Sequence, residues 1–363
     1  MAPSSSNVLS QVRGSCAQLL AHEDASVRVN DAKIALFLET LDWQKYETLA
    51  EPMRFPLNFR TTQEEIAFLS MDHQLRIDVP GCLLTVLCCV CIIALYGLLN
   101  FGSGYRKDLH KYCDRLYGLL GMYISVPALS SAYLQNISLE VVANFFSIPT
   151  ERDEELSPGI YIAKPGPLKP LVQMIKQVLN ECGQKLLERG YADFGAFVIA
   201  NLRSDESKEP SAVHLVEQLT SVFPAFDDHR EVRGEKVFFL KRAQLVVASL
   251  HRRFKDSNPE YTFHDIDDLT AMSDNVLPCV LKALGILEYD SELARVIDAG
   301  EPLPAGTHEC EVRAGAIVAC EKIVAASHGR VNTTDLDHYL WRVGKDPEFR
   351  GLERHATRDT FFY

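Results

Sequence analysis

The stretch that decides the fold runs from Tyr261 to Leu287 and reads YTFHDIDDLTAMSDNVLPCVLKALGIL. Its second half predicts a helix with one face in the core, because apolar residues recur there at steps of three and four. These residues are Val276, Leu277, Val280, Leu281, Leu284 and Leu287. Pro278 falls in the first turn, where its missing N–H does no harm. We expect this helix to anchor the segment in the core.

Four aspartates precede this helix, namely Asp265, Asp267, Asp268 and Asp274. For any one of them the structural interpretation is a helix cap, since a short acidic side chain suits the positive end of a helix. Four carboxylates so close together exceed what one cap requires. Carboxylates at the edge of an apolar wall also stabilise a developing cation or direct a proton. The stretch is therefore a candidate catalytic segment.

The composition predicts a folded chain with a large core. It has 363 residues, of which 47% are hydrophobic, enough for one large domain or two ordinary ones. The sequence KPGPLKP at 164–170 is the clearest internal boundary. We expect an N-terminal helical part over 1–163 and a C-terminal helical part over 164–363 that carries most of the candidate site residues. The two parts are expected to form one compact unit.

Helices dominate the pattern, which predicts a mainly α globule with at most a few short strands, such as 236–240. Residues 1–10 read as a polar start and 150–158 as an acidic linker. No glycine-rich motif of the G-x-G-x-x-G type follows a strand, so we expect no Rossmann-type cofactor site. Besides the helix over 276–287, we expect helices over 27–46, 64–71, 108–123, 139–146, 171–189, 212–223, 241–254, 311–327 and 332–343.

The charge and the cysteines limit the function and the compartment. The net charge is −12, which disfavours binding to a polynucleotide while leaving room for a small anionic ligand. The ten cysteines show no disulfide-like spacing and no secretory leader is visible, so a cytoplasmic location is expected. Cys88 and Cys91 form a C-x-x-C without a second pair nearby, and no metal site is expected.

The segment 81–99 contains no charged residue and is long enough to span a bilayer. It is, however, a single such stretch in a chain whose composition is otherwise typical of a soluble protein, and it runs directly into the glycine-rich turn LNFGSGYR at 99–106. We favour a buried core element, and a membrane anchor is the alternative.

A second acidic position lies in NTTDLDHYLWRVG at 332–344. Thr334 followed by Asp337 fits a variant of the capping box. The alternative is a binding site, because Asp337 precedes Trp341 by one turn and, with Tyr339 nearby, these rings offer a wall on which a planar base can stack. Both interpretations stay open on the sequence.

Cationic residues stand at several places where they need an anionic partner. Lys241 and Arg242 begin a helix, where positive charge opposes the helix dipole. Their partner is either an acid such as Asp228 or the phosphate of a substrate. Arg313, in ECEVRAG, is a further candidate for binding an anion.

Five blocks in this order resemble the queuosine salvage protein family: FLKRAQLVVASLHRRF, YTFHDIDDLTAMSDNVLPCVLKALGILEYDSEL, HECEVRAG, LDHYLW and HATRDTFFY. The resemblance extends from about residue 167 to 363, and LNFGSGYR is a further match. The apolar run and the MDHQLRIDVP before it look like extra sequence relative to the family. The resemblance implies a fold like that of helical DNA glycosylases. It also implies hydrolysis of queuosine 5′-monophosphate, a small nucleotide, to queuine and ribose 5-phosphate without a metal or organic cofactor.

The resemblance also implies roles for individual residues. Phe263 and Asp265 match the positions that contact the base and the sugar, Asp274 matches a substrate-binding aspartate, and Asp337 matches an active-site carboxylate. His338 stands where relatives often have Tyr. Since the sugar becomes positively charged as the bond breaks, we expect Asp337 to act at the sugar and Asp265 to orient sugar, base or water. Further expected substrate-binding residues are Tyr339, Trp341 and Lys241.

Two other functions remain as alternatives at this point. One alternative is a DNA or RNA base glycosylase, because the fold that the resemblance implies is that of helical DNA glycosylases. The net charge of −12 argues against this alternative. The other alternative is a non-catalytic helical nucleoside-binding protein, in which the aspartates serve only as caps.

Overall fold

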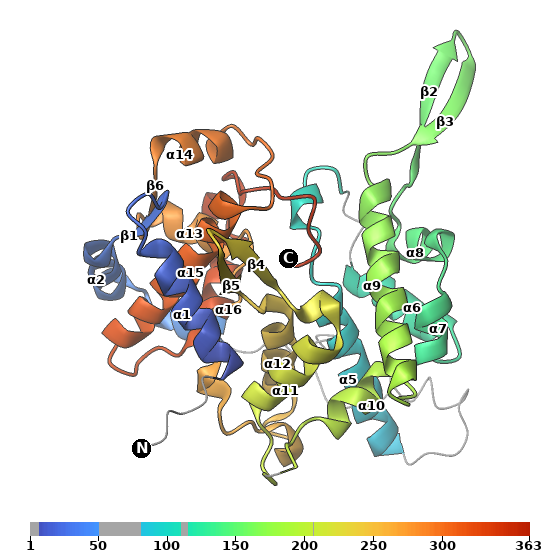
Figure 1. The fold of residues 1–363 in the computed structure, drawn as a ribbon, viewed down its shortest axis with the longest axis horizontal. Coiled ribbons are helices and arrows are strands. Elements are labelled where there is room, and N and C mark those ends of the chain that lie inside the picture. Colours follow the sequence, from blue (N-terminus) through green and yellow to red (C-terminus); the bar gives the residue numbers. More distant parts are fainter. Residues whose placement is uncertain (1–6, 51–80, 110–114, 206) are drawn as a thin grey trace. The chain divides into compact units, whose positions relative to one another are not determined.

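The computed structural model describes residues 7–50, 81–109, 115–205 and 207–363, and it groups the chain into two compact units (Figure 1). The first unit is formed by Met1–Pro52 with Leu202–Tyr363, and the second by Met53–Asn201. Both are mainly helical with short antiparallel strand pairs, which confirms the predicted fold class. The predicted division at 163/164 stays a prediction. The helix expected over 64–71 lies outside the described residues.

The first unit contains most of the candidate site residues. Its helices are α1 (Val8–Leu20), α2 (Asp31–Thr40), α3 (Trp43–Ala50), α11 (Ala212–Val222), α12 (Lys241–Phe254), α13 (Leu277–Ala283), α14 (Ser291–Asp298), α15 (Thr307–Ala326), α16 (Thr333–Val343) and α17 (Pro347–Arg350), with the 3₁₀ turns η2 (Pro224–Phe226), η3 (Pro259–Tyr261) and η4 (Ile266–Asp268). Its strands are β1 (Val27–Val29), β4 (His229–Val232), β5 (Glu235–Phe238) and β6 (Leu287–Tyr289). Strand β1 pairs with β6, and β4 with β5.

Helix α15 forms the centre of this unit, where it packs against α1, α2, α13 and α16. Small residues let its neighbours approach closely. A Cβ added at Gly315 would lie 2.7 Å from Cγ1 of Val27, so the strand β1 passes directly over the helix. Close packing of this kind excludes water and produces the dry surroundings in which buried charges of this unit interact strongly.

The fold-deciding stretch divides into more elements than predicted. Pro278 does lie in the first turn of α13, but the helix ends at Ala283 and Leu287 belongs to β6, opposite Val29. Gly285 explains the early end, because its φ of 72° is left-handed and suits glycine. The N–H of Ile286 then donates to the carbonyl of Leu281 at 2.9 Å, which closes the helix. The prediction of one helix over 276–287 was wrong at its C-terminal end.

The N-terminal predictions also need correction. Residues 27–46 form a strand and parts of two helices instead of one helix, because the side chain of Asn30 caps α2 by accepting from the N–H of Lys33 and that of Asp42 accepts from the N–H of Lys45. Helix α1 begins at Val8, where Asn7 caps it, so the predicted polar start was wrong from residue 8 onward. Short polar residues at 7, 30 and 42 were the missed signals.

The second unit is a helical cluster with one hairpin. Its helices are α5 (Gly81–Leu98), α6 (Arg115–Ser125), α7 (Ser131–Asn136), α8 (Leu139–Phe146), α9 (Lys169–Glu188) and α10 (Phe194–Ala200), with the 3₁₀ turn η1 (Ser103–Tyr105). Strands β2 (Glu151–Ser157) and β3 (Ile160–Pro165) form the hairpin, which extends away from the helices of this unit (Figure 1). The predicted acidic linker at 150–158 was wrong, since most of it is a strand.

The apolar segment is helix α5, and its described side chains are buried except that of Tyr96, which is half-buried. Val90, Ile93, Leu95 and Leu98 are each at most 1% exposed, and α5 packs against α6 and α10. In the described parts of the chain, no helix combines the length and the apolarity that crossing a bilayer requires. The burial of these side chains agrees with the buried-core interpretation from residue 89 onward.

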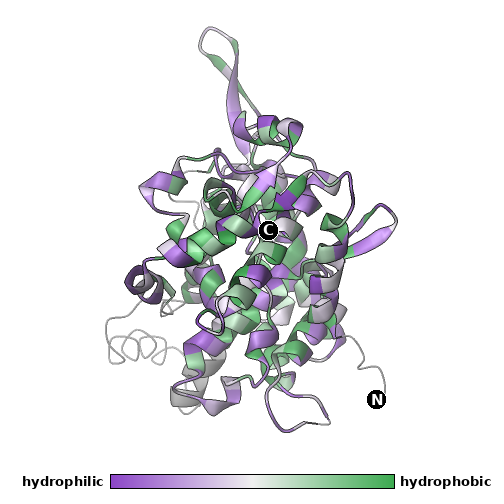
Figure 2. Cartoon of the chain, turned by 90° about the vertical axis from the view of Figure 1, so that its left-hand side faces the viewer, coloured by the Kyte–Doolittle hydropathy of each residue, from purple (hydrophilic) through white to green (hydrophobic). Residues whose placement is uncertain are grey.

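Hydropathy explains why the helices were easier to predict than the hairpin. Figure 2 shows hydrophobic residues spread along the helices, whereas the β2–β3 hairpin is coloured mainly as hydrophilic. The hairpin strands bury little, so the alternation of apolar and polar residues that marks a half-buried strand is missing.

Candidate active site

Asp337 lies in the second turn of α16 and does not cap the helix. The cap is Asn332, whose side-chain oxygen accepts from the N–H of Asp335 at 2.9 Å and whose amide donates to the Asp335 carboxylate at 2.6 Å. The capping interpretation of Asp337 was therefore wrong. Asp337 is 8% exposed, and its Oδ2 accepts a hydrogen bond from the N–H of Met272 at 2.7 Å.

The surroundings of Asp337 tune its ionisation. Burial raises the pKa of its carboxyl from 3.8 to about 6. The Met272 hydrogen bond lowers this pKa, the nearby Asp274 raises it, and the charges of Arg252 and Lys241 lower it. Three residues expected from the sequence, Asp337, Asp274 and Lys241, are thus close enough to interact electrostatically. A carboxyl group with this pKa exchanges its proton near neutral pH.

The loop that carries Met272 and Asp274 is held by a buried glutamine. Gln244 on α12 accepts from the N–H of Thr270 at 2.7 Å and donates to the Thr270 hydroxyl at 2.9 Å. The carboxylate of Asp274 accepts from the N–H of Val276 at 2.6 Å, where α13 begins. Asp274 itself is only partly buried. The loop therefore presents a carboxylate at the edge of the core from a rigid base.

Asp265 is attached to a different helix. It makes no cap for η4, and its carboxylate instead accepts from the Ser211 hydroxyl at 2.6 Å and from the N–H groups of Ala212 and Val213 at 2.6 and 3.1 Å. These donors are the N-terminus of α11, so Asp265 caps a helix that is distant in sequence. The expected roles of Asp265 and Asp337 on one substrate require that both line the same site, and this stays a prediction.

The aromatic residues expected to bind the base make three separate ring contacts. The His338 and Trp341 rings stack at 6.1 Å with 22° between their planes, and the Lys345 ammonium lies 3.1 Å from the Trp341 ring centroid. Tyr339 faces another neighbour, the ring of Tyr46, at 5.1 Å.

Two histidine side chains, His338 and His251, lie beside the aromatic residues expected to bind the base. Burial, with help from Arg252, lowers the pKa of His338 to about 3, so this imidazole is neutral at pH 7. Among the described residues, its buried Nε2 has no hydrogen-bond partner, which leaves one polar atom for a ligand. Phe263 is 2% exposed, and its ring lies 6.1 Å from that of His251.

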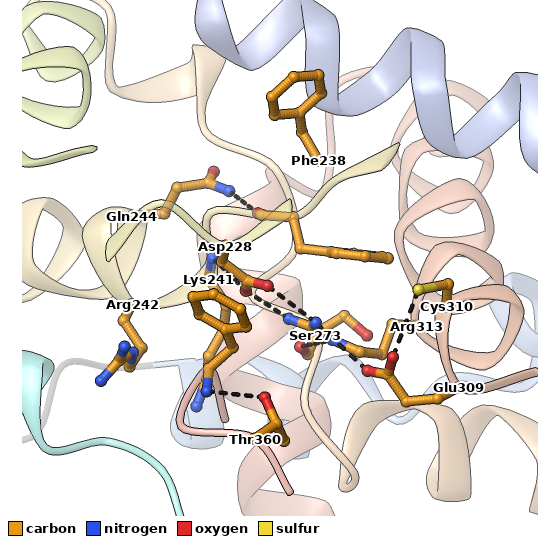
Figure 3. Close-up of polar contacts among 12 residues, drawn as sticks. Asp228, Phe238, Lys241, Arg242, Gln244, Ser273, Glu309, Cys310, Arg313 and Thr360 are labelled. Carbon is orange, nitrogen blue, oxygen red and sulfur yellow. Dashed lines mark hydrogen bonds and ion pairs between the residues drawn. The ribbon is translucent and has the colours of Figure 1, made fainter. Parts of the chain in front are cut away.

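At the start of α12, the backbone of Lys241 and the side chain of Arg242 contact neighbouring segments. The backbone N–H of Lys241 donates to Oδ2 of Asp228 at 3.4 Å. Arg242 donates to the carbonyl of Ala225, and burial lowers the pKa of its guanidinium to about 9. The carboxylate of Asp228 binds Arg313 (Figure 3).

Sequence reasoning missed Arg252 and Gln244. Arg252 donates to the carbonyl of Thr334 and, at 3.2 Å, to the carboxylate of Asp335, so it ties α12 to the start of α16. The available signal was a polar residue on the buried face of an otherwise apolar helix, since such a residue must have a buried partner.

Within the described residues, no group of three or more His, Cys, Asp or Glu side chains is placed to hold a metal ion.

A family model described as queuosine salvage protein matches residues 120–363. The chain belongs to the queuosine salvage protein family. The family match covers every candidate site residue described above and leaves the apolar segment 81–99 and LNFGSGYR outside.

Curated relatives within the queuosine salvage family carry the name queuosine 5′-phosphate N-glycosylase/hydrolase. The protein from Sphaerobacter thermophilus is 34% identical over 241 residues, which cover 65% of this chain and 67% of the relative. The protein from Schizosaccharomyces pombe is 32% identical over 274 residues, covering 72% and 76%. The protein from Bos taurus is 27% identical over 252 residues, covering 65% and 67%.

Proposed function

We propose that this protein hydrolyses the N-glycosidic bond of queuosine 5′-monophosphate, and that the queuine released is salvaged for tRNA modification. The names of the relatives support the reaction and the substrate. The observation that carries the proposal is the environment of Asp337, a buried carboxyl group with a pKa raised to about 6 beside Asp274 and Lys241. No metal or organic cofactor takes part in the proposed reaction.

Asp337 acts on the sugar in this mechanism. Departure of the base places positive charge on the ribose ring, and an ionised carboxylate in a dry site stabilises that charge strongly. The C1′–N9 bond breaks with its electron pair on N9 of the base. A water molecule adds to the anomeric carbon, one of its protons passes to a carboxylate, and the departing base takes up one proton at N9 to give queuine. The leaving base is a 7-deazaguanine, in which the usual ring nitrogen cannot accept a proton. The sugar side and hydrogen bonds to the base edge therefore supply most of the stabilisation.

The remaining residues bind or orient the nucleotide. Asp274, partly exposed at the rim, binds the substrate and keeps a second carboxylate near the sugar, and the Lys241 ammonium is proposed to bind the phosphate. Phe263, Tyr339 and Trp341 provide aromatic surface for the base, while the neutral His338 offers a hydrogen bond. Asp265, held by its contacts with α11, is proposed to orient the sugar, the base or the attacking water.

A free nucleotide in the cytoplasm is the proposed substrate, and a polynucleotide is not. The net charge of −12 repels a phosphate backbone, and the cysteine pattern agrees with a reducing compartment. The competing function is base removal from DNA or RNA.

The test is to incubate the purified protein with queuosine 5′-monophosphate and to follow free queuine and ribose 5-phosphate by chromatography. We expect both products in equal amounts. No release at high enzyme concentration contradicts the proposal, and release only from queuosine-containing tRNA favours the competing function.

A further inference from the structure

Arg313 on α15 is a buried cation that the proposed mechanism does not use. Its side chain is 2% exposed, and its two terminal nitrogens bind the two carboxylate oxygens of Asp228 at 3.1 and 2.6 Å (Figure 3). One of them also lies 3.5 Å from Oε1 of Glu309. Parallel bonds of this kind fix the position and the plane of the guanidinium.

Two aromatic rings enclose this guanidinium. Its central carbon lies 4.0 Å from the ring centroid of Phe239 and 4.5 Å from that of Tyr363. A slot between two rings accepts a planar, delocalised cation, whereas a lysine ammonium has neither the plane nor the fork of donors. The site is therefore specific for arginine.

On one side, the ion pair supports the start of α12. Leu240 immediately precedes Lys241 and has a φ of 51°, which is strained for a leucine. Asp228 stabilises this turn with its backbone carbonyl and with its side-chain carboxylate. Its backbone carbonyl accepts from the N–H groups of Phe239 and Leu240 at 2.9 and 3.3 Å, and its carboxylate accepts from the N–H of Lys241. The direction in which α12 presents Lys241 thus depends on the place of Asp228.

On the other side, the same guanidinium supports the loop that carries Asp274. Nε of Arg313 donates to the carbonyl of Ser273 at 3.3 Å, one residue before Asp274. The next residue, Asn275, donates to the carbonyl of His355 at 3.4 Å, in the segment that leads to Tyr363. The loop is therefore attached to Arg313 directly and to the C-terminal segment beside it.

We infer that Arg313 is a positioning residue that sets the spacing between Lys241 and Asp274 by holding Asp228, Ser273 and Tyr363 around one guanidinium. The inference rests on the proposed function, in which Lys241 and Asp274 bind the nucleotide. A buried ion pair contributes little net stability compared with an apolar replacement. The role of Arg313 is therefore better tested by its effect on substrate binding than by its effect on the free energy of unfolding. Displacing either group by about 1 Å is enough to lower catalysis roughly 100-fold.

The test is Arg313→Lys, which keeps the charge and removes the fork and the plane. We expect kcat/KM for queuosine 5′-monophosphate to fall roughly 100-fold, mostly through a higher KM, because both displaced residues bind substrate. The matched control is Glu311→Gln on the same helix. Glu311 is equally buried and ion-paired, with Arg233 at 3.1 Å, but it accepts from the N–H of Ser26 and touches neither the 273–275 loop nor α12 in these contacts. Its kcat/KM should stay within threefold of wild type.

A second pair of variants covers the case in which Arg313→Lys does not fold. Tyr363→Leu removes one wall of the slot and should raise KM at least tenfold, whereas Tyr363→Phe keeps the ring and should restore KM to near the wild-type value. If the wild type is active and KM is unchanged in Arg313→Lys or in Tyr363→Leu, the positioning role of Arg313 is overturned and the proposed function is not affected. An equal loss in Glu311→Gln also overturns it, because the effect is then general destabilisation. An inactive wild type refutes the proposed function instead.

Discussion

At the scale of single residues, the ionised carboxylate of Asp337 is expected to lower the free energy of unfolding. Its folded pKa of about 6 lies above its unfolded value of 3.8, so the folded state holds this proton more tightly. Ionisation therefore costs folding free energy as the pH rises from about 4 to 6, and the loss reaches about 3 kcal/mol above pH 6. Asp337→Asn does not titrate, and its amide oxygen can still accept from the N–H of Met272.

Denaturant unfolding at several pH values tests this directly. The unfolding free energy of Asp337→Asn minus that of wild type should grow with pH, by up to about 3 kcal/mol between pH 4 and pH 7.5. A difference that is constant over this range would mean that Asp337 titrates normally in the folded protein.

The pH dependence of the reaction reports the same group. Because Asp337 is proposed to act as a carboxylate, kcat/KM should fall tenfold per pH unit below an apparent pKa near 6. The measurement is the initial rate of queuine release at low substrate concentration between pH 4.5 and 8. A rate that rises on acidification through pH 6 would assign Asp337 the role of an acid instead.

Two aspartates show how far residue patterns can be trusted. Both Asp265 and Asp337 occur in contexts typical of caps, but only Asp265 caps a helix, and that helix is α11, more than fifty residues away. Local sequence predicts that a carboxylate needs donors and does not predict which distant segment supplies them. The pairing of Asp337 with Met272 was invisible for the same reason.

At the scale of elements, the contact between Asp265 and α11 gives a distinct prediction. Asp265→Asn retains one acceptor for three donors, so the unfolding free energy should fall by about 1 to 2 kcal/mol. The measurement is urea unfolding with Asp267→Asn as the control, since Asp267 lies in η4 and no cap hydrogen bond forms there. If kcat falls by more than 100-fold while stability is unchanged, Asp265 acts on the substrate directly.

Helices with long apolar stripes were predicted well and short elements were not. α8 and α12 have the predicted bounds, since periodic burial of one face defines them. The strands β1 and β6 have three residues each and are set by pairing between segments more than 250 residues apart. No local pattern carries such information, because the register depends on the partner strand.

At the scale of the whole molecule, the apolar helix α5 should matter for folding. Ile93 is 1% exposed in the second unit, so Ile93→Ala should cost about 2 to 4 kcal/mol of unfolding free energy. Ile124→Ala is the matched control, because Ile124 is 64% exposed and the same truncation there should cost less than about 0.5 kcal/mol. Equal effects of the two variants in thermal or urea unfolding would contradict the burial of α5.

The net charge of the chain makes a prediction about its substrate. With a charge of −12, the protein should not bind tRNA in an electrophoretic mobility assay, and added tRNA should not inhibit hydrolysis of the free nucleotide. Inhibition that weakens steeply with salt would contradict a substrate limited to a small nucleotide.

The most direct measurement compares wild type and Asp337→Asn in the release of queuine from queuosine 5′-monophosphate at pH 7.5, with both proteins shown to be folded by circular dichroism. Wild type should form one queuine per ribose 5-phosphate, and the variant should be slower by roughly 1000-fold, because it lacks the negative charge beside the sugar. A variant that retains activity within tenfold of wild type would contradict the central role assigned to this carboxylate.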